Sequence, residues 1–391
     1  MVTLKGLGLV GLPLAAGFAA WILPLITILG IRREVLPVNN GKCVAVKGLV
    51  GCEDAWIDYE KAEAWLVCSS HEARKSWLPA TLHLDSASLP QVSTDYIAVL
   101  NLDDNSYKKV KLLGLPSDAD GIYVHAIDAV KGPDGKKTVF INSHRPPKNR
   151  SLGKTLGANS VIEIFETTAN PYELKHVKTV SHPLIRTPNN LVATGPRTFY
   201  ASNDHRYKVH WTRAFEMLKS IPSDIIYCDA SKGTPVCKVA ADGLVYPNGI
   251  VHSASKGPGS FLYQGSTLQG LVRVWEERSD HTLKAVAEVP LERPVDNIHV
   301  DLDGAIYATT LTKVLDFMEA GKDGGKSKSA AVEILKITND TASSGSGKYK
   351  SEVVFADDGT IVSSSTTAAP YKGKLVLTGV FSREVSICDL N

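Results

Sequence analysis

The sequence carries almost no excess of charge of either sign. Its 391 residues include 43 lysines and arginines against 41 aspartates and glutamates, which leaves a formal net charge of +2. Nucleic-acid-binding proteins usually present a basic surface, so this balance gives no electrostatic support for a nucleic-acid partner. The sequence also has no Cys-x-x-Cys pair, no histidines spaced for zinc and no Gly-x-Ser-x-Gly motif. These absences argue against a zinc module and against a serine hydrolase.

Long amphipathic helices are scarce as well, and there is no strict internal repeat. After residue 40 the sequence consists of short β-branched and aromatic runs separated by turn residues, such as residues 55–58 and 64–67. This pattern is typical of all-β folds. A propeller blade of four strands takes roughly 50 to 60 residues, so the chain after residue 40 has room for six blades. We therefore expect an all-β fold, a six-bladed β-propeller over residues 40–391, with a pair of β-sandwiches as the alternative.

Ionisable residues are missing from Gly6 to Ile31, a stretch that follows Lys5 and precedes Arg32 and Arg33. The stretch is about long enough to span a bilayer. Its glycines and prolines are unfavourable inside a helix in water but are tolerated in lipid. We expect residues 1–33 to form an apolar signal-anchor helix that contacts the membrane, and cleavage as a signal peptide stays open as the alternative.

The cysteines are even in number, which favours disulfides over free thiols. Cys228 and Cys237 flank a turn-rich segment, so a hairpin would place them on facing strands. The same argument pairs the cysteines that flank residues 59–62, and elimination leaves one pair that would tie the two ends of the globular region together, as closure of a propeller ring requires. Other pairings and buried free thiols remain alternatives. The expected disulfides are Cys43–Cys388, Cys52–Cys68 and Cys228–Cys237.

Two sequons offer asparagines for N-glycosylation, Asn149 in Asn149-Arg150-Ser151 and Asn339 in Asn339-Asp340-Thr341. Together with disulfides they indicate an oxidising, glycosylating compartment. We therefore expect a protein of the secretory pathway, either secreted or anchored on the lumenal or extracellular side of a membrane.

Short motifs that combine carboxylate or carboxamide oxygens with turn-forming residues recur where the expected strands begin or end. Two histidines, His125 and His144, also lie in strand-like segments. Taken singly, each feature is ambiguous, because Asn-Gly commonly forms a turn and an isolated histidine is more often packed than catalytic. The motifs are Gly51-Cys52-Glu53-Asp54, Pro188-Asn189-Asn190, Pro247-Asn248-Gly249 and Val295-Asp296-Asn297.

In their order and spacing these motifs resemble the serum paraoxonase/arylesterase family, and the resemblance extends over nearly the whole chain. It implies a six-bladed propeller, calcium ions in the central tunnel and hydrolysis of small-molecule lactones and aryl esters. Further stretches that carry it are Val46-Lys47-Gly48, Gly195-Pro196, Asn203-Asp204-His205 and Tyr371-Lys372-Gly373-Lys374-Leu375.

The resemblance also implies a set of metal ligands. Calcium accepts six to eight oxygen ligands and tolerates carboxamides beside carboxylates. A second, structural calcium would take Asp54, the carbonyl of Ile127 and a third position where the family has an aspartate and this sequence has Asn190. We expect this second ion to bind more weakly, because Asn190 removes a negative charge. The implied ligands of the first, catalytic calcium are Glu53, Asn189, Asn248, Asp296 and Asn297.

His125 and His144 match the histidine pair of the family, in which the first contacts the attacking water and the second orients it. A free imidazole has a pKa of about 6.5, which suits a general base at neutral pH. Asp296 or Glu53 could activate the water instead. The expected function is a calcium-dependent hydrolase in which the metal stabilises the oxyanion and water attacks the ester.

Two other functions remain open at this stage. The chain could be a propeller that keeps calcium for stability and acts in binding or as a chaperone without catalysis. It could also be a condensing enzyme similar to strictosidine synthase, which shares the propeller but uses a carboxylate and no metal. The complete set of implied calcium ligands argues against this last function.

Overall fold

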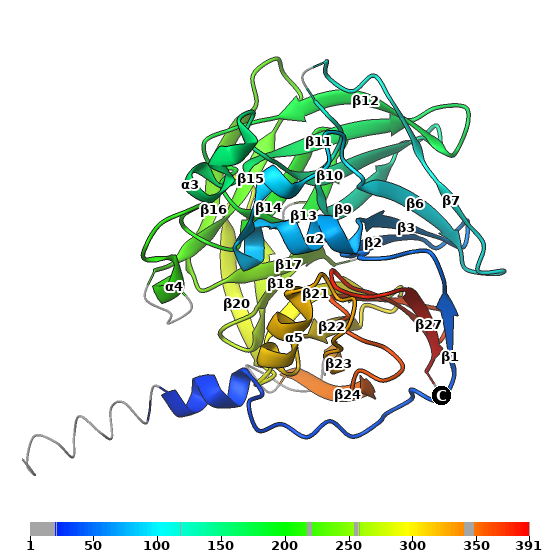
Figure 1. The fold of residues 1–391 in the computed structure, drawn as a ribbon, viewed down its shortest axis with the longest axis vertical. Coiled ribbons are helices and arrows are strands. Elements are labelled where there is room, and N and C mark those ends of the chain that lie inside the picture. The colour runs from blue at the N-terminus through cyan, green and yellow to red at the C-terminus, as the bar shows by residue number, and fades with distance from the viewer. Residues whose placement is uncertain are drawn as a thin grey trace, which may run out of the picture.

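The computed structural model describes residue 20 and residues 22–117, 119–216, 221–253, 257, 259–339 and 348–390 (Figure 1). Most of the expected signal-anchor, residues 1–33, lies outside these ranges. Among the described residues, no helix combines the length and the apolar character needed to cross a membrane.

Six β-sheets surround a central axis as blades, so the expected six-bladed propeller is confirmed (Figure 1). The second blade has a fifth strand, β8 (Lys111–Leu113), which pairs in parallel with the outer strand of that blade. One strand of every blade faces the axis, and these inner strands contact one another in a closed ring. In ring order the inner strands are β2 (Asp54–Asp58), β9 (Val124–Lys131), β13 (Pro188–Gly195), β17 (Pro247–His252), β21 (Val295–Val300) and β25 (Thr367–Tyr371).

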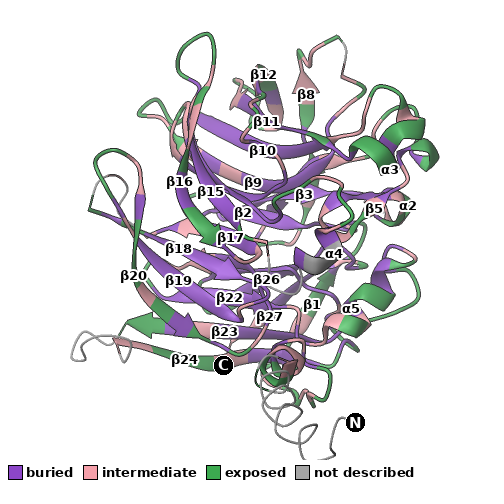
Figure 2. Cartoon of the chain, turned by 90° about the vertical axis from the view of Figure 1, so that its left-hand side faces the viewer, coloured by how far each residue is buried: buried purple, intermediate pink, exposed green. Residues whose placement is uncertain are grey.

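The other strands follow outward from each inner strand, and the outer ones, such as β16, β20 and β24, are exposed along much of their length (Figure 2). These strands are β3 (Glu63–Cys68), β6 (Tyr96–Asn101), β7 (Tyr107–Lys109), β10 (Lys137–Arg145), β11 (Asn159–Thr167), β12 (Glu173–Val180), β14 (Thr198–Asn203), β15 (Ser223–Asp229), β16 (Val236–Leu244), β18 (Phe261–Ser266), β19 (Leu271–Glu277), β20 (Leu283–Pro290), β22 (Ile306–Thr310), β23 (Val332–Asn339), β24 (Tyr349–Asp357), β26 (Lys374–Thr378), β27 (Val385–Asp389) and β1 (Cys43–Val46).

The ring is closed by strands from the two ends of the chain. β1 is the outer strand of the last blade, where it pairs antiparallel with β27 and places Cys43 opposite Cys388. These two cysteines form a disulfide with their Cα atoms 4.1 Å apart. The other two expected disulfides are also present, so all three predicted pairings are confirmed.

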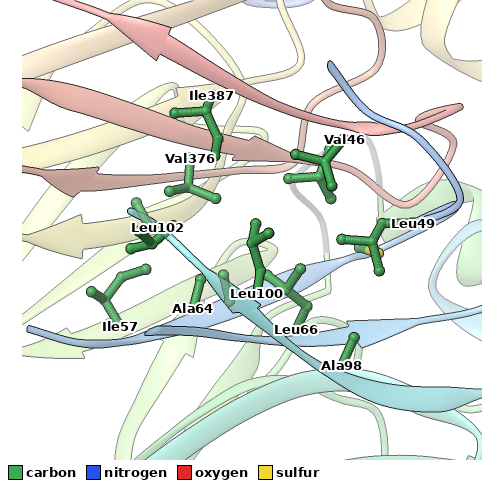
Figure 3. Packing of buried hydrophobic residues seen from close by; sticks show 14 of the residues in the cluster. Val46, Leu49, Ile57, Ala64, Leu66, Ala98, Leu100, Leu102, Val376 and Ile387 are labelled. Atoms are coloured by element: carbon green, nitrogen blue, oxygen red, sulfur yellow. The ribbon is translucent and has the colours of Figure 1, made fainter. Parts of the chain in front are cut away.

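The hydrophobic core is divided into clusters that lie between neighbouring blades. Figure 3 shows the cluster between the last and first blades, where Val376 and Ile387 lie on one side and Leu66 and Leu100 on the other. Full burial of each such side chain contributes roughly 1.5–3 kcal/mol. Equivalent clusters fill the other interfaces around the ring. This packing fixes the inner strands relative to one another, which is what a site at their ends requires.

Short helices gather on one face of the propeller, which we call the helical face (Figure 2). They belong to the connections between strands, and the small hairpin of β4 (Trp77–Leu78) and β5 (His83–Leu84) lies among them. The helices are α2 (His71–Ser76), α3 (Gly153–Leu156), α4 (Arg213–Glu216) and α5 (Val314–Gly321), with 3-10 turns η1 (Pro79–Thr81), η2 (Ser86–Ser88) and η3 (Arg150–Leu152).

Candidate functional site

The inner strands begin at the helical face, and their first residues converge on the axis. Arg74 of α2 shows this arrangement, because its guanidinium donates hydrogen bonds to the carbonyls of Gly51 and Val124, which lead into β2 and β9. Since the inner strands run in the same sense around the ring, residues at equivalent start positions meet. The side chains that the sequence assigns to the catalytic calcium all belong to this set, and each is at most 4% exposed.

Irregular pairing at the strand starts accounts for the direction of these side chains. The register of β13, β17 and β21 with the next strand shifts within the first four residues of each inner strand. β9 has a similar shift between Val124 and Ile127, which spans His125. Such bulges re-aim side chains that a regular strand would point elsewhere. The residues inside the other three shifts are Asn189, Asn248, Gly249, Asp296 and Asn297.

Gly249 brings two of these strands unusually close. The Asn248-Gly249 pair belongs to β17 and is not the turn that such a pair commonly forms. A Cβ at position 249 would lie 2.6 Å from the Cα of Asn297 and 2.8 Å from the carbonyl oxygen of Asp296. A glycine is therefore required where β17 passes β21, and this approach places Asn248 beside Asp296.

Two buried carboxylates, Glu53 and Asp296, form the charged part of the cluster. Burial raises the pKa of Glu53 well above its usual value, and repulsion from Asp296 raises it further, although Arg74 and a hydrogen bond from Thr366 oppose the shift. Burial likewise raises the pKa of Asp296 to about 8. Acids in this environment are stabilised in their charged form by a cation, so the electrostatics of the pair fit a divalent metal ion.

Asn189 and Asn248 supply the second indication of a metal. Neither Oδ1 atom has a hydrogen-bond partner among the described residues, although both are buried. The amide nitrogen of Asn248 is bonded to Thr267 Oγ1 at 3.1 Å, which leaves its oxygen free to face the axis. Buried carbonyl oxygens without a donor are costly, and coordination to a cation removes that cost. The donor set therefore fits a hard, oxygen-preferring ion such as calcium.

Asn297 has a different arrangement. Its Oδ1 accepts a hydrogen bond of 2.7 Å from Asn190, and its Nδ2 donates to Thr367 Oγ1 at 3.0 Å. Its Nδ2 also lies 3.5 Å from Glu53 Oε1. An amide oxygen has a second lone pair, so Asn297 can ligate a metal and keep its bond to Asn190. The described residues contain no cluster of three or more His, Cys, Asp or Glu suited to a metal, because amides make up most of this donor set.

The two candidate histidines are neighbours beside the carboxylates. The ring centres of His125 and His144 are 5.0 Å apart, and His125 Nε2 lies 4.0 Å from Glu53 Oε1. Neither nitrogen of His125 has a hydrogen-bond partner among the described residues. Burial lowers the pKa of His125 well below its usual value, and His144 lowers it further. Burial also lowers the pKa of His144 to about 4.

Residues that the sequence did not single out hold His144 in place. Ser160 Oγ lies 2.9 Å from His144 Nδ1, and the Trp77 indole donates a 2.7 Å hydrogen bond to the His144 carbonyl. The remaining nitrogen, His144 Nε2, has no hydrogen-bond partner within the part of the chain that the structure describes. Ser160 faces His144 across the hairpin of β10 and β11, so the register of that hairpin is the signal that could have found it. Nothing in the local sequence around Trp77 indicates its role, since it lies 67 residues from His144.

A second group, to which the sequence analysis assigned no role, forms the wall next to the histidines. His205 Nδ1 lies 2.8 Å from Asp204 Oδ1 and 3.2 Å from Arg213 Nη2. Burial opposes ionisation of Asp204, yet His205 and Arg213 together lower its pKa to about 2. His205 had appeared in the resemblance without a role. Arg213 lies in α4, and its sequence context gives no signal of this contact.

Thr366 and Thr367 complete the ring of strand starts at β25. Their hydroxyls donate to the backbone carbonyl of Glu53 at 2.9 and 3.0 Å, and Thr366 also donates to Glu53 Oε2 at 2.8 Å. Their position in the sequence could have identified them, because they lie at the start of the sixth inner strand, as the candidate ligands lie at the starts of other inner strands.

The residues assigned to the second calcium also come together, one layer further along the tunnel. Asn190 Nδ2 lies 3.3 Å from Asp54 Oδ2, and the backbone nitrogen of Ile127 donates to the same oxygen at 3.1 Å. The Asp54 carboxylate thus has donors from both of the other residues assigned to this ion.

The candidate glycosylation sites differ in how far the structure describes them. Asn149 is exposed, and its Oδ1 accepts a 2.8 Å hydrogen bond from Ser151 Oγ of the same sequon. Asn339 is exposed at the end of β23, while the rest of its sequon lies outside the described residues.

The space around the two ends of the tunnel is unequal. On the helical face, a cavity of about 10 Å³ lies between His144, Asp204, Lys208 and Arg213, which is room for about one water molecule. At the opposite end, a cavity of about 730 Å³ reaches Asp54, Asn190 and His299.

Comparison with known proteins agrees with this architecture. A family model described as Arylesterase matches residues 152–390. Serum paraoxonase/arylesterase 1 of Rattus norvegicus is 28% identical over 395 residues, which cover 100% of both chains. Serum paraoxonase/lactonase 3 of Oryctolagus cuniculus is 25% identical over 363 residues, or 90% of each chain. The solved structure of the major Malassezia sympodialis allergen Mala s 1 has a TM-score of 0.54 at 12% identity and covers 90% of this chain and 96% of that one, a likeness of fold alone.

Proposed function

The chain belongs to the serum paraoxonase/arylesterase family, and from that premise we propose that it is a calcium-dependent hydrolase of carboxylic esters, with lactones and aryl esters as substrates. Membership in this family suggests an ester or lactone hydrolase. The observation that carries the finer proposal is the convergence of amide oxygens and buried carboxylates beside His125. Among the described residues, neither these amide oxygens, those of Asn189 and Asn248, nor the His125 ring nitrogens have a hydrogen-bond partner.

In this proposal one calcium ion is held by the ligands at the starts of the inner strands. When bound, the ion supplies a Lewis acid that polarises the ester carbonyl and stabilises the oxyanion. Glu53 and Asp296 match its charge, and their burial keeps competing water away. The ligands are Glu53, Asn189, Asn248, Asp296 and Asn297.

His125 accepts the proton of the attacking water in this proposal, and His144 orients it. The lowered pKa of His125 keeps the ring neutral near pH 7, so a ring nitrogen is available as an acceptor. Glu53 and Asp296 are the alternative bases. A carboxylate that holds a cation is a weaker base than a free one, which favours His125 over both acids.

The first experiment tests activity and metal together. Purified protein with calcium is expected to hydrolyse phenyl acetate or members of a panel of γ- and δ-lactones. Removal of calcium by a chelator should abolish hydrolysis while the circular dichroism spectrum still shows a folded β protein, and added calcium should restore it. Absence of hydrolysis across the whole panel would instead favour a propeller that keeps calcium for stability alone. Hydrolysis that persists in chelator would exclude the metal from catalysis.

A matched pair of variants tests the histidine. His125→Gln is expected to lower kcat by about 100-fold or more, as the loss of a general base does, with calcium content unchanged. His182→Gln changes a partly exposed histidine away from the tunnel and should leave kcat unaltered. A fully active His125→Gln variant would transfer the role of base to Glu53 or Asp296.

Three disulfides and the family likeness suggest the secretory pathway. We propose in addition that residues 1–33 are a retained signal-anchor, that residues 40–391 form the hydrolase domain on the lumenal or extracellular side, and that Asn149 and Asn339 carry glycans. Protein made in a eukaryotic secretory host should lose mass on N-glycosidase treatment and keep its leader. A mature N-terminus beyond residue 33 would contradict the anchor.

A further inference from the structure

The lower layer of the tunnel contrasts with the upper one in how its polar atoms are used. Asp54 is 3% exposed, and its carboxylate has donors on both oxygens. Oδ1 accepts from the backbone nitrogen of Ala55 at 2.9 Å, and it lies 3.2 Å from Thr367 Oγ1, whose one proton is shared with the Glu53 carbonyl. Oδ2 accepts from Ile127 at 3.1 Å and from Asn190 at 3.3 Å. A carboxylate offers about four lone-pair positions, so donors of the protein occupy most of the positions that a metal would use.

The orientation of the Asn190 amide is fixed by a local bond. Its Oδ1 accepts a 2.7 Å hydrogen bond from the backbone nitrogen of Leu191. The NH₂ group therefore points the other way, where it donates to Asp54 and, at 2.7 Å, to Asn297 Oδ1. Two N–H bonds carry partial positive charge into the centre of the layer. A cation at that point would meet hydrogen atoms where a ligand oxygen is needed.

His299 adds to this arrangement. Its Nε2 lies 3.8 Å from Asp54 Oδ1, and its side chain is 17% exposed toward the cavity at this end of the tunnel. The His299 ring nitrogen, which can carry a proton, thus lies near the Asp54 carboxylate. In the upper layer, by comparison, Asn189 Oδ1 and Asn248 Oδ1 have no donor among the described residues. Two amide oxygens of the upper layer therefore lack a hydrogen-bond donor among the described residues, whereas the amide oxygen of Asn190 in the lower layer has one.

We infer that the lower layer binds no calcium, and that hydrogen bonds from Asn190 to Asp54 and Asn297 link the inner strands there instead. The protein then holds one calcium ion, in the upper layer. The inference rests on the proposed calcium of the upper site. It differs from the expectation of a second, weaker ion, because Asn190 supplies a donor at the point where a ligand oxygen would be required.

The direct test is the calcium content of the folded protein, measured by equilibrium dialysis with elemental analysis. The wild type is expected to bind one equivalent and Asn190→Asp to bind two, because the new carboxylate replaces a donor with a ligand. Asn101→Asp adds the same charge on an outer turn of the first blade and should stay at one equivalent. Asn248→Ala should lose the single ion, which assigns it to the upper layer.

The alternative outcomes are distinct. Two equivalents in the wild type would overturn the inference and leave the proposed function intact. No bound calcium in the wild type would overturn the proposed metal site, and this inference with it. A folded Asn190→Asp variant that still binds one equivalent would remove Asn190 as the cause.

Thermal stability gives a second readout that does not depend on activity. Asn190→Ala should lower Tm by a similar amount in calcium and in chelator, because a hydrogen-bond layer is present in both conditions. A loss of stability seen only in calcium would instead reveal a metal held by this layer and contradict the inference.

Discussion

Burial decides the protonation state of the histidine pair. His125 and His144 are 3% and 5% exposed, and desolvation is the main reason that both pKa values fall below the usual range. A neutral imidazole at neutral pH is the form that accepts a proton. The same burial acts in the opposite direction on Glu53 and Asp296, whose pKa values rise. The residues that would perform the chemistry are therefore buried at an electrostatic cost.

This cost predicts a pH dependence of stability that belongs to His144. Its pKa is about 4 in the folded protein and about 6.5 when unfolded. The unfolded chain binds the extra proton first, so stability is lost as pH falls from about 6.5 toward 4. Relative to His144→Gln, the wild type should lose about 3 kcal/mol between pH 7 and pH 4. Denaturant unfolding of both proteins across this range is the measurement, and parallel curves would contradict the assignment.

At the scale of single strands, the site depends on irregularity at the strand starts. A register shift moves a side chain to the other face of a strand, and β9, β13, β17 and β21 each have such a shift beside a candidate residue. Pro-Asn and Asn-Gly pairs commonly form turns, so by themselves they are weak evidence for a metal site. In this fold both kinds of pair lie inside strands. Such pairs commonly follow the end of a strand. Here they lie at the start of a strand and bend its first residues toward the axis.

Gly249 offers a test of this arrangement. A Cβ at this position would lie 2.8 Å from the nitrogen of Ile298, closer than a Cβ atom approaches its neighbours in proteins. Gly249→Ala should therefore push β17 from β21, destabilise the protein by roughly 2–3 kcal/mol and reduce its calcium content. Gly233→Ala is the matched control, because no atom lies within 4 Å of its Cβ. Calorimetry and metal analysis compare the two, and equal behaviour would refute the role of the close approach.

The molecule as a whole depends on the closure of the ring. β1 and β27 come from opposite ends of the chain, and without β1 the last blade would lose its outer strand. The inner strands are held at fixed positions only while all six blades pack against their neighbours. The pairing of β1 with β27, which closes the ring, therefore contributes to the geometry of the tunnel, although these strands lie far from the axis.

The disulfides should differ in how much each contributes to the free energy of unfolding, according to the length of chain that each one closes. Cys43–Cys388 spans 345 residues and Cys228–Cys237 spans 9. A loop-entropy estimate gives about 6 kcal/mol for the first and about 3 kcal/mol for the second. The double variant Cys43→Ala/Cys388→Ala should thus lose roughly twice the unfolding free energy of Cys228→Ala/Cys237→Ala. Urea denaturation without reductant measures both, and equal losses would argue against ring closure as the source.

The sequence alone determined the fold class, the pairing of all six cysteines and the list of candidate ligands. The fold class and the disulfide pairing follow from period, turn chemistry and local symmetry, which a linear pattern records, whereas the ligand list follows from the resemblance of the ordered motifs to a known family. The tertiary structure decided which polar atoms of the site have hydrogen-bond partners within the protein and which remain available to a metal ion. Arg74 and Trp77 reach the site through contacts with Val124 and His144, which lie 50 and 67 residues away in the sequence, and no local signal reports such contacts. Asn189 and Asn190 are the clearest case, because these adjacent and chemically identical amides differ in their partners: Asn190 Oδ1 accepts from Leu191 and its NH₂ group donates to Asp54, whereas Asn189 Oδ1 has no partner among the described residues.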